Sequence, residues 1–470
     1  MRISEILREG ALRSRIEALS FGMRSGRLSP VDVFRETRFK QGYSKNQGIL
    51  VEPLGETSLA QARSSEKRYL NDEQFGLLDG IPFGVKDLID VEGCTTSRGS
   101  LLYRNAPPAK RNAEAVERLG FQGMVFGGKT NLSELAFSGV GTNDLFGSPI
   151  NPRATTGKYI TGGSSSGSAA GVASGLWPVS LGTDTSGSSR IPAAFCGVVG
   201  FKPSFDRYPL RGVAPLAPSL DHLGINALTV QDCVILDQAL RGLAPIPKFR
   251  MLSEQTEFLV PRNKSIQPRD PHIKDNFDKT LDLLSNLGFE IHEVDFSPYA
   301  EVDRLFEIHG SLVAHEAAQQ YEALFENGLT SYIDPKILQR LKEGTLLNRK
   351  SYALLQKIRR NLRAELSSSI GNKILLQPTV KILPPAIESV LKGVEEFKAF
   401  NKLILGNTMY ANYLGMPAIA IPNGHAPNGF STSIQLSAAS GKDDFLLKTA
   451  LFLEAALSKQ NIYTPDTVSH

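Results

Sequence analysis

Two segments of the chain combine several serines with glycines, and serine hydroxyls on such backbone can take part in catalysis. The first segment reads YITGGSSSGSAAG over residues 159–171, and the second reads DTSGSSR over residues 184–190. Glycine allows backbone angles and close approaches to a substrate that other residues do not allow. A serine hydroxyl becomes a good nucleophile only when a neighbouring base takes its proton, so the chain must supply that base elsewhere.

Histidine is the usual base for a catalytic serine, but the seven histidines of this chain form no recognisable catalytic pattern. Asp221 and His222 are adjacent in sequence, and adjacent side chains rarely face each other. The second serine segment also lacks the G-x-S-x-G spacing that places a serine on a sharp turn before a helix. A histidine-based triad is therefore not favoured.

A buried lysine is another candidate base, because desolvation lowers its pKa and favours the neutral amine. Lys86 is the candidate here, since it ends the apolar run IPFGVK over residues 81–86. The alternative is a surface lysine that pairs with Asp87. The segment IPFGVKD, taken alone, favours that surface ion pair.

One further segment matches a phosphate-binding motif. Residues 123–130 read GMVFGGKT and fit the pattern G-x-x-x-x-G-K-[ST], in which a loop after a strand cradles phosphate. The positions that would form the loop are apolar, which is typical of a buried strand. We interpret the segment as the end of a strand, with Lys129 near the surface or capping a turn.

Helices and strands alternate along much of the chain, which predicts an α/β fold. Residues 1–70 have a helical pattern that is interrupted at 25–30 and around Gly48. Further helices are expected at 113–120, 168–177 and 274–288, and across most of the charged segment 297–371. Strands are expected at 81–86, 121–128, 178–184, 289–296, 373–380 and 416–424.

The composition is that of a globular protein with balanced charge. The 470 residues are 41% hydrophobic, and 52 basic against 48 acidic side chains give a net charge of +4. This balance argues against nucleic acid or an anionic membrane surface as a partner. No apolar run of about eighteen residues and no secretory signal are found, so we expect a cytoplasmic protein. Its three cysteines, which form no CxxC pair, are expected to be reduced: Cys94, Cys196 and Cys233.

Several long motifs together resemble the amidase signature family. They are GIPFGVKD (80–87), GKTNLSELAFSGVGTN (128–143), GGSSSGSAAGVASG (162–175), GTDTSGSSRIPAAFCGVVGFKPS (182–204), SLDHLG (219–224), LLQPTV (375–380) and NYLGMPAIAIPNG (412–424). The resemblance implies an α/β/α fold in which helices cover both faces of a large mixed β-sheet. It also implies one domain over residues 1–470, with a variable helical region at about 297–371.

The resemblance places a Ser–Ser–Lys triad on three residues of this chain, without a metal or a cofactor. Lys86 falls on the base, Ser164 on the serine that relays the proton after a cis peptide bond, and Ser188 on the nucleophile. These matches make Lys86 a catalytic candidate rather than a surface ion pair. The implied oxyanion hole consists of four backbone N–H groups, those of Thr185, Ser186, Gly187 and Ser188.

Other residues receive supporting roles from the same motifs. Asp184 and Arg190 are expected to form a structural ion pair beside the nucleophile, and Ser165 is expected to donate a supporting hydrogen bond. Ser166 and Ser168 are interpreted as turn and helix-start residues. Two positions depart from the usual family pattern, because Ser186 replaces a glycine and Ser189 an apolar residue. Substrate contact is assigned to Phe137, Ser138 and Gly139.

The predicted activity is hydrolysis of a carboxylic amide through an acyl-enzyme, in a protein that acts alone. The alternative is the glutaminase (A) subunit of a tRNA-dependent amidotransferase, since SLDHLG resembles the SLDQIG of those subunits. The expected partner is a small-molecule amide, without membrane or direct nucleic-acid contact, and a homodimer is left open. The many Lys and Arg residues of 330–371 favour a solvated helix surface over a docking face.

Overall fold

The computed structural model describes residues 14–43, 48–53, 55–245, 256–346 and 349–460. Within them, eleven strands form one sheet in the order β1-β3-β2-β4-β6-β5-β10-β11-β9-β7-β8. The strands are β1 (Leu50–Glu52), β2 (Pro82–Lys86), β3 (Val125–Thr130), β4 (Val179–Thr183), β5 (Val199–Lys202), β6 (Leu223–Ala227), β7 (Glu257–Pro261), β8 (Ile291–Val294), β9 (Lys373–Pro378), β10 (Ala418–His425) and β11 (Ser431–Ser437).

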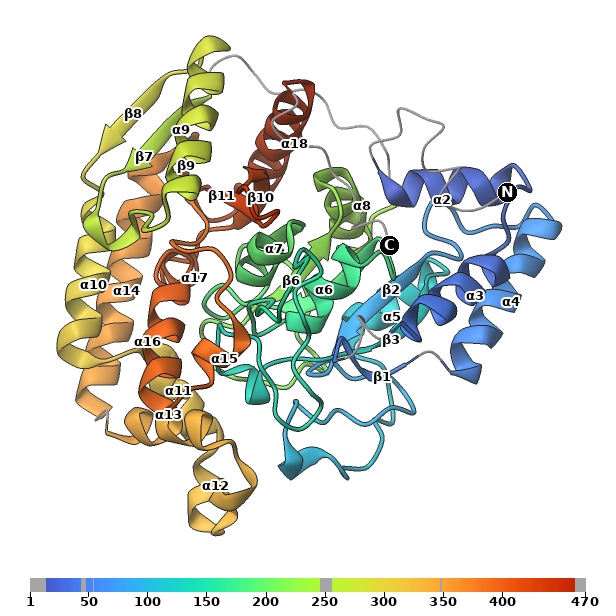
Figure 1. The fold of residues 1–470 in the computed structure, drawn as a ribbon, viewed down its shortest axis with the longest axis horizontal. Helices are drawn as coiled ribbons and strands as arrows, with labels where there is room; N and C mark the ends of the chain where they lie inside the picture. Colours follow the sequence, from blue (N-terminus) through green and yellow to red (C-terminus); the bar gives the residue numbers. More distant parts are fainter. Residues whose placement is uncertain (1–13, 44–47, 54, 246–255, 347–348, 461–470) are drawn as a thin grey trace.

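Helices precede, follow and connect these strands (Figure 1). The α-helices are α2 (Arg15–Arg24), α3 (Pro30–Gln41), α4 (Glu56–Leu70), α5 (Glu114–Phe121), α6 (Ser166–Ala173), α7 (Arg190–Cys196), α8 (Val230–Leu240), α9 (Pro271–Asn286), α10 (Ser297–His309), α11 (Leu312–Gln320), α12 (Glu322–Glu326), α13 (Pro335–Thr345), α14 (Arg349–Ile370), α15 (Ile387–Val390), α16 (Val394–Leu405), α17 (Met409–Tyr413) and α18 (Asp443–Lys459). The short 3-10 helices are η2 (Leu101–Tyr103), η3 (Glu134–Ala136), η4 (Lys264–Ile266) and η5 (Leu329–Tyr332).

The sheet is mixed, as predicted. β2 pairs in parallel with β3 on one side and with β4 on the other, whereas β4, β6, β5, β10 and β11 pair antiparallel in succession. Parallel neighbours end at the same edge of a sheet, and ligands commonly bind beyond that edge. Lys86 at the end of β2 therefore lies beside Thr183 at the end of β4.

The predicted covering of both faces is confirmed, and the alternation along β2 shows how it arises. Successive side chains of a strand point to opposite faces. Phe83 and Val85 belong to a buried cluster that also holds residues of α5, α8, α9 and α18. Gly84 faces the other side, where an added Cβ would lie 2.5 Å from Trp177. Lys86 shares this second face, which α6 covers.

The segment 297–371 is helical, as its pattern predicts, and forms α10 to α14 with η5 (left side of Figure 1). Its apolar side chains, such as Leu312 and Tyr321, join a buried cluster with α16 and α17. The prediction of a solvated basic surface is wrong for Arg359, which is buried and donates to the carbonyl oxygens of Tyr413 and Ser219. Lys357 and Arg360 are exposed, as expected.

The segment that matched the phosphate-binding motif is a buried strand, but its details differ from the prediction. β3 begins at Val125, because Gly123 adopts a left-handed conformation with φ +80° in the turn after α5. Lys129 is completely buried rather than near the surface. Its Nζ lies 3.0 Å from Asp87 Oδ1 and donates to Ile89 O over 2.6 Å. Asp87 thus pairs with Lys129 and not with Lys86.

Five strands were not predicted: β1, β5, β6, β7 and β11. β5 and β6 are short and contain glycine, which weakens the sequence signal of a strand. β11 alternates polar and apolar residues, yet all of its side chains are buried between the two helical layers. β1 is a three-residue edge strand inside a segment whose pattern is otherwise helical.

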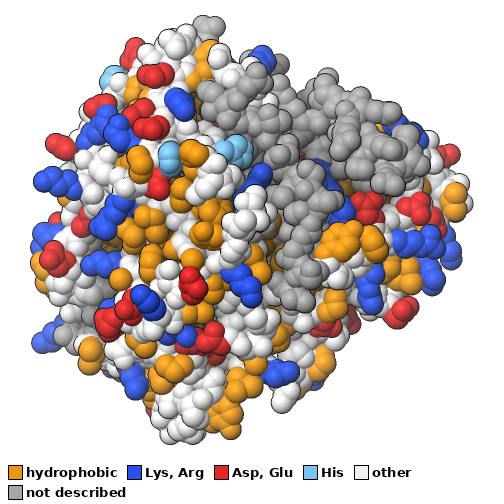
Figure 2. Space-filling model, viewed as in Figure 1, with side chains coloured by type: hydrophobic (Ala, Val, Ile, Leu, Met, Phe, Trp, Pro, Cys, Tyr) orange, Lys and Arg blue, Asp and Glu red, His pale blue; other side chains and the backbone are white. Residues whose placement is uncertain are grey.

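The surface agrees with the balanced composition. On the face shown in Figure 2, basic and acidic side chains are interspersed, and apolar side chains gather near its middle. None of the described helices is long and apolar enough to cross a membrane. The three cysteines are free thiols, with Cys196 and Cys233 buried and Cys94 partly exposed.

The close approach of Gly84 to Trp177 yields a stability prediction. Gly84→Ala places a methyl group against a buried indole, so we expect the free energy of unfolding to fall by about 1–3 kcal/mol. Gly120→Ala is the matched control, because an added Cβ there meets nothing within 4 Å. The control should leave stability unchanged or raise it by about 0.5 kcal/mol. Urea unfolding measures both, and equal effects of the two variants would contradict the packing argument.

Candidate active site

Lys86 is buried and contacts two hydroxyl groups. Its Nζ donates to Ser164 Oγ over 2.7 Å and to Thr183 Oγ1 over 2.7 Å. No carboxylate of the described residues lies within ion-pair distance of this amine. Burial lowers the pKa of Lys86 to about 7, although Asp184 and Asp221 act in the opposite direction. An appreciable share of this lysine is therefore neutral at neutral pH.

Ser164 lies just before the N-cap of α6, in a turn whose close backbone packing requires glycine. The peptide bond between Gly163 and Ser164 is cis, as the resemblance implies. A Cβ at Gly163 would lie 2.7 Å from the backbone of Gly141, so no larger residue fits there. Ser133 N donates to Ser164 O over 3.1 Å and fixes the same turn from the segment after β3.

The structure brings the two serine segments together. Ser165 N donates to Ser188 O over 3.1 Å, and Ser165 Oγ donates to Thr183 O over 3.1 Å. Ser165 thus makes the supporting contacts expected of it. No hydrogen bond among the described residues joins Ser188 Oγ to Ser164 Oγ. Catalytic contacts of this kind often tighten only when substrate binds.

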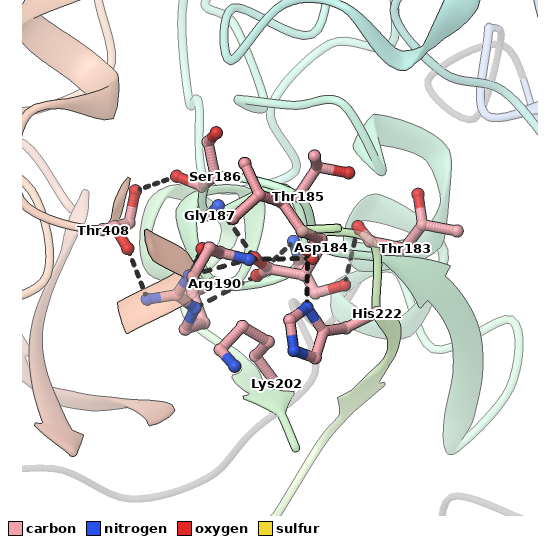
Figure 3. Close-up of polar contacts among 12 residues, drawn as sticks. Thr183, Asp184, Thr185, Ser186, Gly187, Arg190, Lys202, His222 and Thr408 are labelled. Carbon is pink, nitrogen blue, oxygen red and sulfur yellow. Dashed lines mark hydrogen bonds and ion pairs between the residues drawn. The ribbon is translucent and has the colours of Figure 1, made fainter. Parts of the chain in front are cut away.

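Asp184 and Arg190 form the expected ion pair, which Figure 3 shows at the centre of the polar network. Arg190 donates through Nε and Nη2 to the two carboxylate oxygens of Asp184, over 3.0 and 2.9 Å. Burial works against the charged carboxylate, but Arg190 holds the pKa of Asp184 well below its usual range. Arg190 also donates to Thr408 O, Gln435 Oε1 and Asn412 Oδ1. All three nitrogens of this guanidinium therefore donate hydrogen bonds within the protein.

The ion pair also shapes the loop that carries Ser188, the predicted nucleophile. Asp184 Oδ1 accepts from Gly187 N over 2.8 Å, and Asp184 Oδ2 accepts from Ser189 N over 3.1 Å. The role expected for Gly187 in the oxyanion hole does not fit this structure, because its N–H already donates to a carboxylate. The N–H groups of Thr185, Ser186 and Ser188 donate to none of the described residues and stay available.

The two departures from the family pattern are accommodated without backbone strain. The left-handed position in this loop is Gly187, with φ +125°, and neither Ser186 nor Ser189 has a positive φ. An added Cβ at Gly187 would lie 2.0 Å from Thr408 Oγ1, which donates to Ser186 O. Ser189 is buried, and its hydroxyl donates to Thr183 O over 3.2 Å.

The segment expected to contact substrate lies next to Ser164. Gly163 N donates to Gly139 O over 2.8 Å. Ser138 Oγ and Gly139 N both donate to Asn401 Oδ1 of α16, and the ring of Phe137 is buried. These internal contacts fix the shape of the segment, and its contact with substrate stays a prediction.

Three residues near the site were not assigned a role from the sequence. Thr183 is the second partner of Lys86, and only its place beside Asp184 in the motif pointed to it. Lys202 is buried under Asp184 and donates to Pro203 O over 2.7 Å, and burial lowers its pKa to about 7. His222 is buried beside it and contacts no candidate serine, since its Nδ1 lies 2.7 Å from Leu220 O. This arrangement gives no support to a histidine-based triad at His222.

One group of side chains in the described residues has the spacing of metal ligands. Glu257 of β7, Glu290 just before β8 and His292 of β8 lie close together at the edge of the sheet that these strands form, and they are not buried. Glu257 already pairs with Lys373, whose Nζ lies 2.7 Å away. The group is far along the sheet from β2 and takes no part in the candidate site.

A family model described as amidase matches residues 40–447 of the chain. The chain belongs to the amidase family. Its sequence is 29% identical to that of the A component of the mitochondrial glutamyl-tRNA(Gln) amidotransferase of Homo sapiens. The alignment, gaps included, is 499 positions long and covers 93% of each chain. The chain is 30% identical over 459 residues to AtzE, which belongs to the 1-carboxybiuret hydrolase of Pseudomonas sp. (strain ADP), covering 92% of this chain and 96% of the relative.

Solved structures agree with this assignment. A crystal structure of an amidase superimposes with a TM-score of 0.81 at 30% identity, covering 93% of this chain and 98% of that one. A protein from a vestigial complex, linked to the origins of an s-triazine catabolic enzyme, gives a TM-score of 0.84 at 28% identity, covering 95% and 99%. Family and neighbours together make this chain an amide hydrolase.

The hydrogen bond from Lys86 to Thr183 leads to a prediction about pH. If the neutral amine is the active form, kcat/KM for an amide should rise with pH through about 7 in the wild type. The Thr183 hydroxyl accepts from the ammonium and stabilises it, so Thr183→Val should lower the pKa of Lys86. We expect the rising limb to move down by about one pH unit. Thr183→Ser keeps the hydroxyl and should keep the profile, whereas an upward shift in Thr183→Val would contradict this role.

Proposed function

We propose that this amide hydrolase cleaves carboxylic amides through a serine acyl-enzyme, with Ser188 as nucleophile, Ser164 as proton relay and Lys86 as base. The observation that carries the proposal is the contact between Lys86 Nζ and Ser164 Oγ, formed by a buried amine that has no carboxylate partner among the described residues. A lysine in such surroundings can accept a proton at neutral pH. The serine segments meet beside it.

In the proposed reaction, Ser188 Oγ attacks the amide carbonyl carbon while its proton passes through Ser164 Oγ to Lys86 Nζ. The carbonyl oxygen becomes an oxyanion, which the available N–H groups of the loop stabilise by about 3 kcal/mol for each donor. The C–N bond then breaks, and the proton returns from Lys86 through Ser164 to the departing nitrogen. Water, deprotonated by the same relay, cleaves the ester and releases the carboxylate.

We further propose that residues 1–470 form one domain that acts without partner subunits. Arg190 in the second serine segment contacts residues of α17 and β11, so the site needs the C-terminal part of the chain. The match to a crystallised amidase over nearly its whole length supports a stand-alone enzyme. The comparable match to the A component of an amidotransferase supports the alternative, in which the chain releases ammonia from glutamine for its partners.

The nucleophile can be identified by covalent labelling. A fluorophosphonate probe should modify Ser188, and Ser188→Ala should abolish both labelling and turnover without loss of thermal stability. Ser186→Ala and Ser189→Ala are matched controls on the same loop, and both should still be labelled. Mass spectrometry of the modified peptide reads the site directly. A label on Ser186 or Ser189 would refute the assignment of Ser188.

Activity of the purified chain separates the two kinds of amidase. We expect hydrolysis of small primary amides by the chain alone, at a rate changed less than about twofold by tRNA or by amidotransferase partner subunits. Release of ammonia from a panel of amides, glutamine among them, measures this. Inactivity on every simple amide, followed by glutamine hydrolysis once partner subunits are present, would assign the chain to the amidotransferase.

A further inference from the structure

Arg98 lies on unusual backbone beside the strand that ends in Lys86. Its N–H donates to Asp87 O over 3.0 Å, and its carbonyl oxygen accepts from Leu135 N over 2.9 Å. Its φ is +55°, in the left-handed region that residues other than glycine seldom adopt. Residues held in such conformations cluster at functional sites. The backbone of Arg98 is thus fixed next to Asp87, the residue that follows the candidate base Lys86.

The guanidinium of Arg98 has no acidic partner among the described residues. It lies over the ring of Tyr103, with its central carbon 4.1 Å from the ring centroid. Two other partly buried arginines in this half of the chain, Arg68 and Arg207, form short ion pairs with aspartates. Arg98 is partly buried like them, but its charge is not compensated in the same way.

A second unsatisfied polar group lies next to this guanidinium. Tyr321, which follows α11, is buried, and its oxygen faces the N–H donors of Arg98, but its O–H group has no acceptor among the described residues. Burial raises the pKa of Tyr321, and the Arg98 guanidinium is the strongest charge acting against that rise. A buried hydroxyl without an acceptor costs free energy, so a bound acceptor beside Arg98 would satisfy the O–H of Tyr321.

These two groups also adjoin the loop of the nucleophile. Asp221 is close enough to Tyr321 to influence its pKa, and Asp221 Oδ1 accepts from Thr185 Oγ1 over 2.7 Å. No hydrogen bond among the described residues joins Asp221 to the Tyr321 hydroxyl, and the oxygens of Asp221 accept from Leu216 N and Ala217 N instead. A group bound between Arg98 and Tyr321 would therefore lie near both the Lys86 strand and the oxyanion loop.

We propose that Arg98 and Tyr321 bind a carboxylate of the substrate, so that this enzyme prefers amides that carry a carboxylate distant from the scissile bond. The guanidinium offers parallel N–H donors that match the two oxygens of a carboxylate, and the phenol adds a third donor. Tyr103 holds the plane of the guanidinium before substrate arrives. The inference rests on the proposed function and names the substrate class for the same site.

Matched substrates test the preference. Malonamate, succinamate and glutaramate are each compared with the unbranched neutral amide of equal chain length. For at least one pair, we expect kcat/KM of the carboxylated member to be about 10- to 100-fold higher. Arg98→Met should remove this advantage mainly through KM and leave the neutral amide unchanged. Tyr321→Phe should cost several-fold for the carboxylated member alone.

Controls separate recognition from folding. Arg98→Lys keeps the charge but not the paired donors, so it should show only part of the preference of the wild type. It replaces Arg98→Met as the test if that variant folds poorly. Arg104→Met removes an exposed arginine of the same segment and should change nothing. Equal rates for both members of every pair, or equal losses for both in Arg98→Met, would overturn the inference while leaving amide hydrolysis intact.

A binding measurement keeps the inference testable if turnover fails. Malonate, succinate and glutarate are titrated by calorimetry into Ser188→Ala and into Ser188→Ala with Arg98→Met. Binding of at least one dicarboxylate to the first protein, weakened at least tenfold in the second, supports the site. Absence of binding to both proteins overturns it. Failure of the proposed function gives a different result: fluorophosphonate does not label Ser188 in the wild-type protein, although the Ser188→Ala protein still binds dicarboxylate.

Discussion

Lys86 contacts two hydroxyls and can act as the proposed base only if the carboxylates around it are paired with other cations. Asp87, the next residue, forms a completely buried ion pair with Lys129 on the adjacent strand. Asp184, at the end of the other neighbouring strand, is held by Arg190. A carboxylate in direct contact would keep the amine charged, so the two ion pairs preserve a desolvated lysine that can lose its proton. Breaking either pair would leave an uncompensated charge next to the base.

The ion pair of Asp184 also connects the chemistry to the rest of the fold. Its carboxylate binds two N–H groups of the loop, and its arginine binds side chains and backbone contributed by α17 and β11. These partners are more than two hundred residues away in sequence. The loop of Ser188, the proposed nucleophile, therefore has its shape only when the C-terminal strands have joined the sheet. Such dependence makes the catalytic geometry a property of the whole chain, and not of its motifs alone.

Features that depend on local sequence or on a family motif could be predicted. Features that depend on how distant segments pair could not. The apolar run before Lys86 predicted the strand, and the family motifs placed both serine segments at one site. The partner of Asp87 was not predictable, because two lysines compete for it and the pairing depends on strand order. Gly187 was assigned to the oxyanion hole from its position in the family motif. The direction of its N–H depends on the carboxylate of Asp184, which accepts from it, and the motif does not show this contact.

The two arginines near the site show why burial alone does not identify function. Arg190 is buried with every side engaged, and such a group can only hold structure in place. Arg98 is held with equal firmness by its backbone, yet neither its charge nor the neighbouring Tyr321 hydroxyl meets an acidic partner among the described residues. If Arg98 and Tyr321 bind a substrate carboxylate as proposed, residues that select the substrate are separate from those that hold the Asp184 loop and the Lys86 strand, so substrate preference could change while that loop and strand stay the same.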